Sequence, residues 1–230
     1  MAINVYWSCL ENESLRSKEP EPLLKTYYNS DIYDPSTNIS KCPSFNDYFK
    51  NVFCLKSIYD YSFTYHEGTQ VASTSFFDQD FFDKHVIVRS RPKKMFSFTT
   101  KFVFFTEEKS LLMSAEMPSL IENNLVNNLM WIPGQFDIGR WYRNIDFAFY
   151  MKNGIDSFDI KEGDIFYQLR FHTNEKINFI KFYENDKLKS FRDLVIDSKK
   201  YKIKNKGIED YYNMFDLKKK IIKEIKKNSV

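Results

Sequence analysis

Three histidines are the side chains of this sequence best suited to metal chemistry. His66, His85 and His172 lie far apart along the chain, and none forms an H-x-H, H-x-D or H-x-x-x-H pair. Histidines from different strands can converge in space, so a metal-dependent enzyme on a jelly-roll scaffold that uses His66, His85 or His172 is one hypothesis. Because a histidine on a strand is more often simply solvated, the sequence predicts no metal site and no cofactor.

The sequence contains no clear motif for a catalytic nucleophile or for a phosphate-binding loop. There is no G-x-S-x-G elbow, and Cys42-Pro43-Ser44 fits the approach to a helix better than a nucleophile beside a base. The six glycines are scattered singly, which excludes a G-x-G-x-x-G or Walker loop. Residues 162–171 resemble the closing hairpin of dUTPase-like nucleotide hydrolases, but the catalytic Asp and the Ser/Gly phosphate motif of those enzymes are missing. The sequence therefore favours a non-enzymatic function.

The most distinctive stretch is WIPGQFDIGRWYR at 131–143, which holds two of the three tryptophans and two arginines. Rigid aromatic rings beside Arg are typical of recognition surfaces, and such surfaces are usually displayed on loops of a rigid scaffold. The candidate binding residues of this predicted loop are Trp131, Asp137, Arg140, Trp141 and Arg143. The alternative is that the tryptophans close one end of the core and the arginines pair with local carboxylates.

A basic C-terminal segment offers a third kind of chemistry. From Lys199 onward there are eleven lysines and four acidic residues, about +7, in a chain whose net charge is +3. Such a tail suits nucleic acid, a membrane surface or an acidic partner. Leu217, Ile221 and Ile225 repeat at helical spacing, however, and predict a helix over 208–227 that packs on the domain with its lysines in water. Nucleic-acid binding through this helix stays as an alternative that we do not favour.

The elements that must position these residues are mostly strands. Alternation of apolar and polar residues with period two predicts strands at 3–9, 58–66, 85–89, 96–105, 111–117, 145–151, 158–160, 165–171 and 177–182. Two alternations are especially clear and predict one apolar face each: Ile145, Phe147, Phe149 and Met151 in the first, and Ile165, Tyr167, Leu169 and Phe171 in the second. Short strands separated by turns indicate a mainly β protein, an antiparallel β-sandwich of jelly-roll type.

One internal helix is predicted at 44–56, capped by Ser44. Its proposed apolar stripe consists of Phe45, Tyr48, Phe49, Val52 and Phe53. The polar stretches 11–43 and 183–207 are interpreted as connections.

Composition sets the broad class. The 230 residues are 43% hydrophobic and 18% aromatic, with 23 Phe and 15 Tyr but only six Gly and seven Pro. This excludes collagen-like, low-complexity and disordered chains, and no apolar run suits a membrane span or a signal peptide. Cys9, Cys42 and Cys54 are too few and too scattered for a disulfide scaffold, which predicts free thiols and a reducing compartment. We expect a single soluble domain, a sandwich over 1–207 with the helix of 208–230 packed on it.

The order of several motifs is similar to an uncharacterised protein family of T4-like marine cyanophages and, more loosely, to a bacterial domain of unknown function. The motifs are Cys42-Pro43 with Lys50-Asn51, the Phe-rich segment 96–105, Pro-Gly-x-Phe-Asp-Ile-Gly-x-Trp at 133–141, Glu-Gly-Asp at 162–164 and Arg170-Phe171. The resemblance implies a phage origin and a place in the host cytoplasm or the virion, but no activity. Together with the residues, it leads us to expect a binding or structural module. Its expected partner is an unidentified protein or virion component, or a second copy of the chain, without membrane contact.

Overall fold

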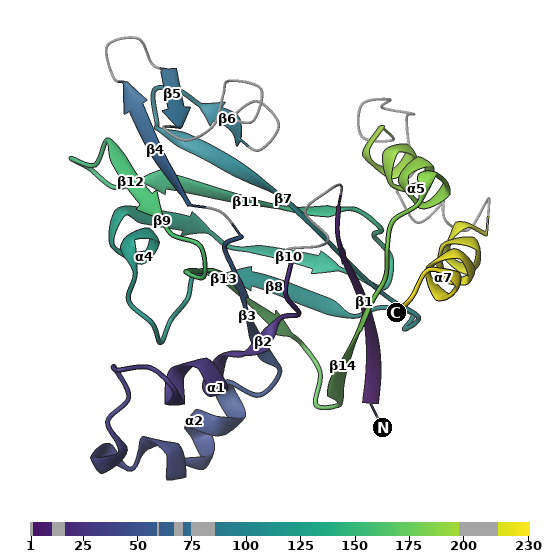
Figure 1. Ribbon diagram of the computed structural model, residues 1–230, viewed down its shortest axis with the longest axis horizontal. Coiled ribbons are helices and arrows are strands. Elements are labelled where there is room, and N and C mark those ends of the chain that lie inside the picture. Colours follow the sequence, from purple (N-terminus) through teal and green to yellow (C-terminus); the bar gives the residue numbers. More distant parts are fainter. Residues whose placement is uncertain (1, 11–16, 59, 67–70, 75–85, 198–215) are drawn as a thin grey trace.

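Strands in three sheets, mostly antiparallel, form the largest part of the regular structure, with 42% strand against 25% helix (Figure 1). The structure is a computed structural model that describes residues 2–10, 17–58, 60–66, 71–74, 86–197 and 216–230. A mainly β fold is therefore confirmed. No sheet closes into a barrel within these ranges, and the strand order does not show a jelly roll.

The largest sheet, sheet A, has the order β14-β1-β7-β11-β9. Its strands are β1 (Ala2–Cys9), β7 (Met95–Thr106), β9 (Leu129–Ile132), β11 (Asn144–Met151) and β14 (Lys176–Lys181). A further strand, β6 (Val86–Ser90), shares one edge of the long strand β7 with β1. β1 and β14 pair in parallel, a departure from the expected antiparallel sandwich, because alternation along one strand carries no information about the direction of its neighbour.

The second sheet, sheet B, has the order β10-β8-β13-β3-β2, and a third has the order β12-β4-β5. Sheet B consists of β2 (Glu21–Pro22), β3 (Val52–Lys56), β8 (Leu112–Glu116), β10 (Gly134–Asp137) and β13 (Ile165–Phe171). The third sheet consists of β4 (Tyr61–His66), β5 (Val71–Thr74) and β12 (Ser157–Ile160).

The main core contains side chains from all three sheets and is dominated by aromatic rings. On β11 the predicted face of Ile145, Phe147, Phe149 and Met151 is buried there, as the alternation requires. The Phe147 ring from sheet A lies 3.7 Å, between ring centroids, from the Tyr167 ring of sheet B. Sheets A and B therefore pack against each other through this core.

The predicted inward face of β13 is correct for Tyr167, Leu169 and Phe171 but wrong for Ile165. The pairing of β13 with β3 shifts register between Ile165 and Tyr167. The shift places Phe166 in the main core and Ile165 on the outer face of sheet B. An irregularity of this kind leaves no trace in a period-two pattern.

Helices cover the outer faces of both large sheets. α5 (Asp186–Asp197) and α7 (Leu217–Lys227) pack on sheet A, where Leu217, Ile221 and Ile225 are buried. The docking predicted for the C-terminal helix is confirmed for 217–227, while residues 208–215 lie outside the described ranges. The interpretation of 183–207 as a connection is wrong over α5. In Figure 1 this helix pair lies on the opposite side of the molecule from α1 and α2.

The outer face of sheet B carries short helices instead. They are α1 (Leu23–Tyr28), the 3-10 turns η2 (Pro35–Thr37) and η3 (Ile39–Lys41), and α2 (Pro43–Tyr48), while α4 (Asn124–Asn128) precedes β9. The predicted connection 11–43 is thus partly structured. Leu23, Phe49, Val52, Cys54 and Ile165 form a small apolar cluster beneath these helices.

The helix predicted at 44–56 is too long. α2 ends at Tyr48, and Asn51 adopts a left-handed φ of 56° before β3 begins at Val52. Ser44 does not cap the helix, because Pro43 is already within its first turn. Phe49 is buried, but Tyr48 is 61% exposed, so the predicted apolar stripe is not a single packed face.

All three cysteines are free, with Cys9 and Cys54 buried and Cys42 exposed, which confirms the absence of a disulfide. None of the described helices has the length and apolar character that a membrane span requires.

Candidate functional site

The stretch predicted as one recognition loop is divided between two strands and a turn. Trp131 lies on β9 of sheet A, Asp137 ends β10 of sheet B, and the turn 138–143 leads into β11. The interpretation of all of 131–143 as a loop is therefore wrong, because residues 129–132 and 134–137 pair with β11 and β8. The chain passes from sheet A to sheet B at Pro133 and returns to sheet A through the turn.

Trp131 packs against the core rather than standing out from it. Its ring contacts those of Phe147, Phe149 and Phe166 at centroid distances of 5.6 to 6.1 Å. Its indole nitrogen is buried and finds no hydrogen-bond partner among the described residues. This placement matches the alternative in which a tryptophan closes one end of the core.

Asp137 fixes the start of the turn. Its Oδ1 accepts hydrogen bonds from the backbone N–H groups of Gly139 (3.0 Å) and Leu111 (3.2 Å). Its Oδ2 accepts one from the Ser110 hydroxyl (2.6 Å) and pairs with Nε of Arg140 (3.2 Å). The carboxylate is only 9% exposed, so these bonds satisfy a buried charge and fasten the turn to the loop before β8.

Gly139 is required by close packing. A Cβ atom here would lie 2.6 Å from the carbonyl oxygen of Glu108 and 2.9 Å from Cα of Ser110. Both atoms belong to the backbone and cannot move aside as a flexible side chain would. The turn therefore presses directly on residues 108–110.

Two further contacts hold the turn from its other sides. The ammonium group of Lys218, at the start of α7, donates hydrogen bonds to the carbonyls of Gly139 (2.7 Å) and Glu108. Burial lowers the pKa of Lys218, although nearby Asp137 opposes this effect. Tyr142 is completely buried against Phe105 (centroid distance 5.5 Å).

The two remaining candidates differ in how they are held. Arg143 donates hydrogen bonds to the carbonyl of Asn144 (3.2 Å) and to Asp146 (3.0 Å), and its side chain is 15% exposed. This local pairing matches the alternative interpretation of the arginines. Trp141 is partly exposed and contacts no other aromatic ring of the described chain. Both tryptophans are partly exposed, but only the Trp131 ring packs on other aromatic rings of the described chain.

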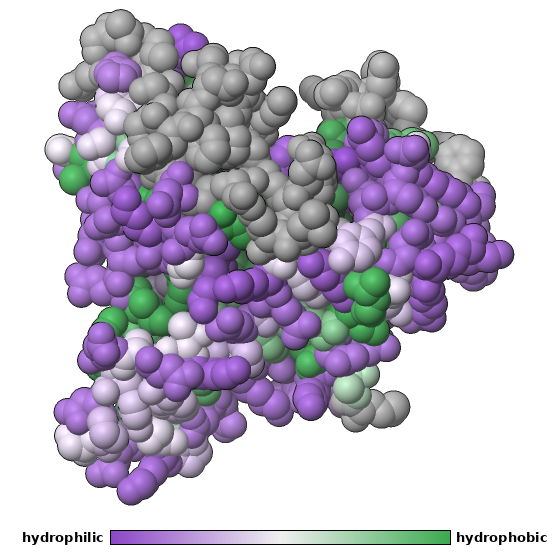
Figure 2. All heavy atoms as spheres, viewed as in Figure 1, coloured by the Kyte–Doolittle hydropathy of each residue, from purple (hydrophilic) through white to green (hydrophobic). Residues whose placement is uncertain are grey.

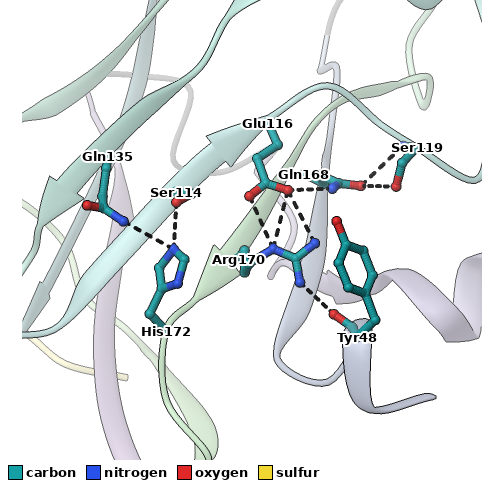
Figure 3. A network of polar contacts seen from close by, with 8 residues as sticks. All are labelled: Tyr48, Ser114, Glu116, Ser119, Gln135, Gln168, Arg170 and His172. Atoms are coloured by element: carbon teal, nitrogen blue, oxygen red, sulfur yellow. Dashed lines mark hydrogen bonds and ion pairs between the residues drawn. The ribbon is translucent and has the colours of Figure 1, made fainter. Parts of the chain in front are cut away.

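A second polar surface, which the sequence reasoning missed, lies on the outer face of sheet B (Figure 3). Arg170 donates hydrogen bonds to Glu116 (3.1 and 3.3 Å) and to the carbonyl of Tyr48 (2.5 Å), and its guanidinium lies 4.3 Å from the centre of the Tyr48 ring. Gln168 joins Glu116 to Ser119. This network ties the end of α2 to the sheet.

At the other end of the same face, His172, Ser114 and Gln135 come together. Nε2 of His172 lies 2.6 Å from the Ser114 hydroxyl and 3.3 Å from the Gln135 amide nitrogen. The sequence does indicate that Ser114 and Glu116 share one face of their strand, and that Arg170 and His172 share another, because alternate residues of a strand point the same way. It does not indicate that the two strands are neighbours, so the contact could not be predicted.

The two histidines that the structure describes lie in different sheets. His66 ends β4 in the third sheet, His172 follows β13 in sheet B, and His85 lies outside the described residues. Within the described part of the chain, no three His, Cys, Asp or Glu side chains are grouped to hold a metal ion.

Two polar clefts of about 290 and 380 Å³ adjoin at the edge of sheet B where β2 pairs with β3. Both are lined by the Lys56–Glu21 ion pair (3.0 Å). Burial raises the pKa of Cys54, which lines one of them, and its sulfur lies 3.4 Å from the Thr26 hydroxyl. A thiol kept protonated in this way is a poor nucleophile.

The lysines of α7 are largely paired within the chain. Lys226 bonds Glu107 (2.8 Å), Lys227 bonds Glu224 (3.4 Å), and Lys218 holds the turn. Lys226 and the hydroxyl of Tyr6 together lower the pKa of Glu107. Figure 2 shows that the surface over α5 and α7 is predominantly hydrophilic.

Comparison with known proteins gave no relatives: no protein-family model, no curated protein and no solved structure matches this chain. The functional argument therefore depends on the geometry described above.

Proposed function

We propose that the chain is a non-enzymatic binding module of phage origin that recognises a protein partner through the turn at residues 138–143. The observation that carries this proposal is Trp141, a partly exposed tryptophan on a turn that is fastened at four points. The fastenings are made by Asp137, Gly139, Tyr142 and Lys218. Phage origin is supported by the sequence resemblance alone.

Rigidity is what makes this tryptophan suited to recognition. Ordering a side chain or loop on binding costs about 0.5–1.5 kcal/mol for each immobilised side chain, and a turn that is already fixed avoids much of this cost. Tryptophan and arginine are the residues most enriched among those that dominate binding energy. Arg140, with its side chain 37% exposed, adds a cation next to Trp141. We therefore expect a partner surface with an apolar pocket bordered by acidic groups.

The basic helix supports nucleic-acid binding less well. Lys218, Lys226 and Lys227 are engaged by carbonyls or carboxylates of the chain itself. Binding to nucleic acid gains free energy when lysines neutralise phosphates and displace the counterions condensed on the nucleic acid, and pairing within the chain removes part of the charge that could do so.

A site-specific photo-crosslinker tests the proposal in cells that naturally produce the protein. A photoreactive phenylalanine at position 141 should give a discrete cross-linked product, identifiable by mass spectrometry. The same group at position 48, where Tyr48 is also exposed but lies at the end of α2, should not give that product.

Competition then shows whether the tryptophan itself is recognised. Unmodified protein should suppress the product, whereas Trp141→Ala should compete at least tenfold less well while unfolding at the same urea concentration. Equal competition by Trp141→Ala would refute the proposal. A product that consists of two copies of this chain would identify the partner as the protein itself.

A further inference from the structure

We propose that Ser114 and His172 form a serine–histidine pair that reacts with acyl esters on the open outer face of sheet B. This activity is separate from partner binding at the turn 138–143. The Ser114 hydroxyl lies 2.6 Å from Nε2 of His172, within the range of a nucleophile and its general base (Figure 3).

The sheet itself sets this geometry. Ser114 on β8 lies opposite Gln135 on β10 and opposite Arg170 on β13. His172 follows β13, and its backbone N–H bonds the carbonyl of Leu112 (3.0 Å). Ser114 and Gln135 therefore stand on paired strands and His172 directly follows a third, which positions the site more precisely than a mobile loop would.

The reaction uses the tautomer of His172 that carries its ring proton on Nδ1. The Gln135 amide nitrogen, a donor only, lies 3.3 Å from Nε2 and donates a hydrogen bond to it in that tautomer, so the contact favours it. With Nε2 as acceptor, the Ser114 hydroxyl must donate to it. That is the arrangement in which the imidazole can remove the serine proton.

The reaction balances with water as the second substrate. Ser114 Oγ attacks the acyl carbon while its proton passes to His172 Nε2, and the ester C–O bond breaks as the alcohol leaves with that proton. Water then attacks the acyl carbon of the acyl-serine while its proton passes to His172, and the acyl–Oγ bond breaks as that proton passes from His172 to Ser114 Oγ, which releases the acid and restores both residues. The second N–H of Gln135, which bonds no other described residue, can donate to the oxygen that becomes negative.

The site fits exposed, activated esters rather than a deeply enclosed substrate. His172 and Gln135 are exposed, and neither of the two clefts is lined by them. The charged groups that neighbour the pair on β8 and β13, Glu116 and Arg170, are bonded to each other. Among the described residues no carboxylate bonds the imidazole of His172, so we expect slow turnover.

A fluorophosphonate probe and p-nitrophenyl acetate test the proposal on the full-length protein. Mass spectrometry should locate one fluorophosphonate adduct on Ser114. Ser114→Ala should abolish labelling, and His172→Ala should slow it roughly 100-fold, the usual contribution of a general base. Added imidazole should restore part of the rate in His172→Ala.

Ser119→Ala provides the matched control, since Ser119 bonds Gln168 on the same face and neither of the described histidines bonds it. It should label like the unmodified protein. No adduct at Ser114, or equal labelling of His172→Ala without imidazole, would show that the contact is only a cross-strand hydrogen bond. Circular dichroism of each variant separates loss of reactivity from loss of folding.

Discussion

Replacing Asp137 should both destabilise the protein and release the turn that displays Trp141. Asp137→Ala removes four interactions: with the N–H groups of Leu111 and Gly139, the Ser110 hydroxyl and Arg140. Hydrogen bonds to a charged group contribute about 1.5–3 kcal/mol each, and a buried N–H left without a partner costs about 1–3 kcal/mol. Because the Arg140 side chain is 37% exposed, its ion pair adds little. We expect a total loss of about 3–5 kcal/mol, since the terms are not fully additive.

Asp137→Asn shows how much of this loss comes from the negative charge of Asp137, because asparagine has almost the same shape without the charge. The amide oxygen can still accept from both backbone N–H groups, while the amide nitrogen repels Arg140 and no longer accepts from Ser110. The expected loss is about 1–2 kcal/mol, a hydrogen bond and a weak ion pair. Urea unfolding followed by circular dichroism measures both values.

A second measurement follows the turn directly. Protein labelled with 5-fluorotryptophan should give one fluorine resonance for each tryptophan, assigned by single Trp→Phe variants. In Asp137→Ala the Trp141 resonance should narrow and shift toward that of free fluorotryptophan, while those of Trp7 and Trp131, which are in the core, should change little. A stability loss below about 1 kcal/mol, or an unchanged Trp141 resonance, would contradict the assignment of Asp137 as the main fastening of the turn.

Two further predictions concern the covering helix. Ile221→Asp places a carboxylate at a completely buried position between α7 and sheet A, and it should lower the free energy of unfolding in urea by more than about 3 kcal/mol. Lys223→Glu, on the exposed side of α7, should change that free energy by less than about 0.5 kcal/mol. Equal effects of the two changes would mean that α7 is not docked. Hydrogen bonds from Asn185 and Lys187 lower the pKa of Glu224 from 4.5 to about 2, so its stabilising effect is present above pH 4.5 and is lost as the pH falls toward 2. Glu224→Gln should therefore flatten the acid side of the stability profile over that interval, and an unchanged profile would refute this role.

The strands that were predicted well are those with one polar face. Residues 145–151 alternate cleanly because only one side of β11 faces the main core, and the predicted and observed bounds differ by a single residue. β3 was missed for the opposite reason. Both of its faces are buried or half-buried, so Val52 and Phe53 look like successive positions of a helical stripe.

Helix α5 was not predicted because its segment contains too few apolar residues to give a clear helical pattern. It begins and ends with Asp, and in the described structure only Leu188 and Val195 are fully buried along it. So few apolar anchors do not stand out from a polar connection. α7 was predicted because three buried aliphatic residues repeat at intervals of four.

The candidate site depended on a distinction that the sequence does not contain. Trp131 and Trp141 have similar neighbours in the sequence: Gly, Arg and aromatic residues. In the structure the Trp131 ring packs against Phe147, Phe149 and Phe166, whereas the partly exposed Trp141 contacts no aromatic ring of the described chain. The difference comes from pairing: β9 joins β11 and turns Trp131 toward the core, whereas Trp141 follows a carboxylate that stops β10. Asp137, selected as a binding residue because of its place in the motif, acts by fastening the chain that presents Trp141. Abundant aromatic residues therefore indicate a recognition surface only where the backbone holds an aromatic side chain away from the core. Here the buried carboxylate of Asp137 fixes the turn that holds Trp141 in this way.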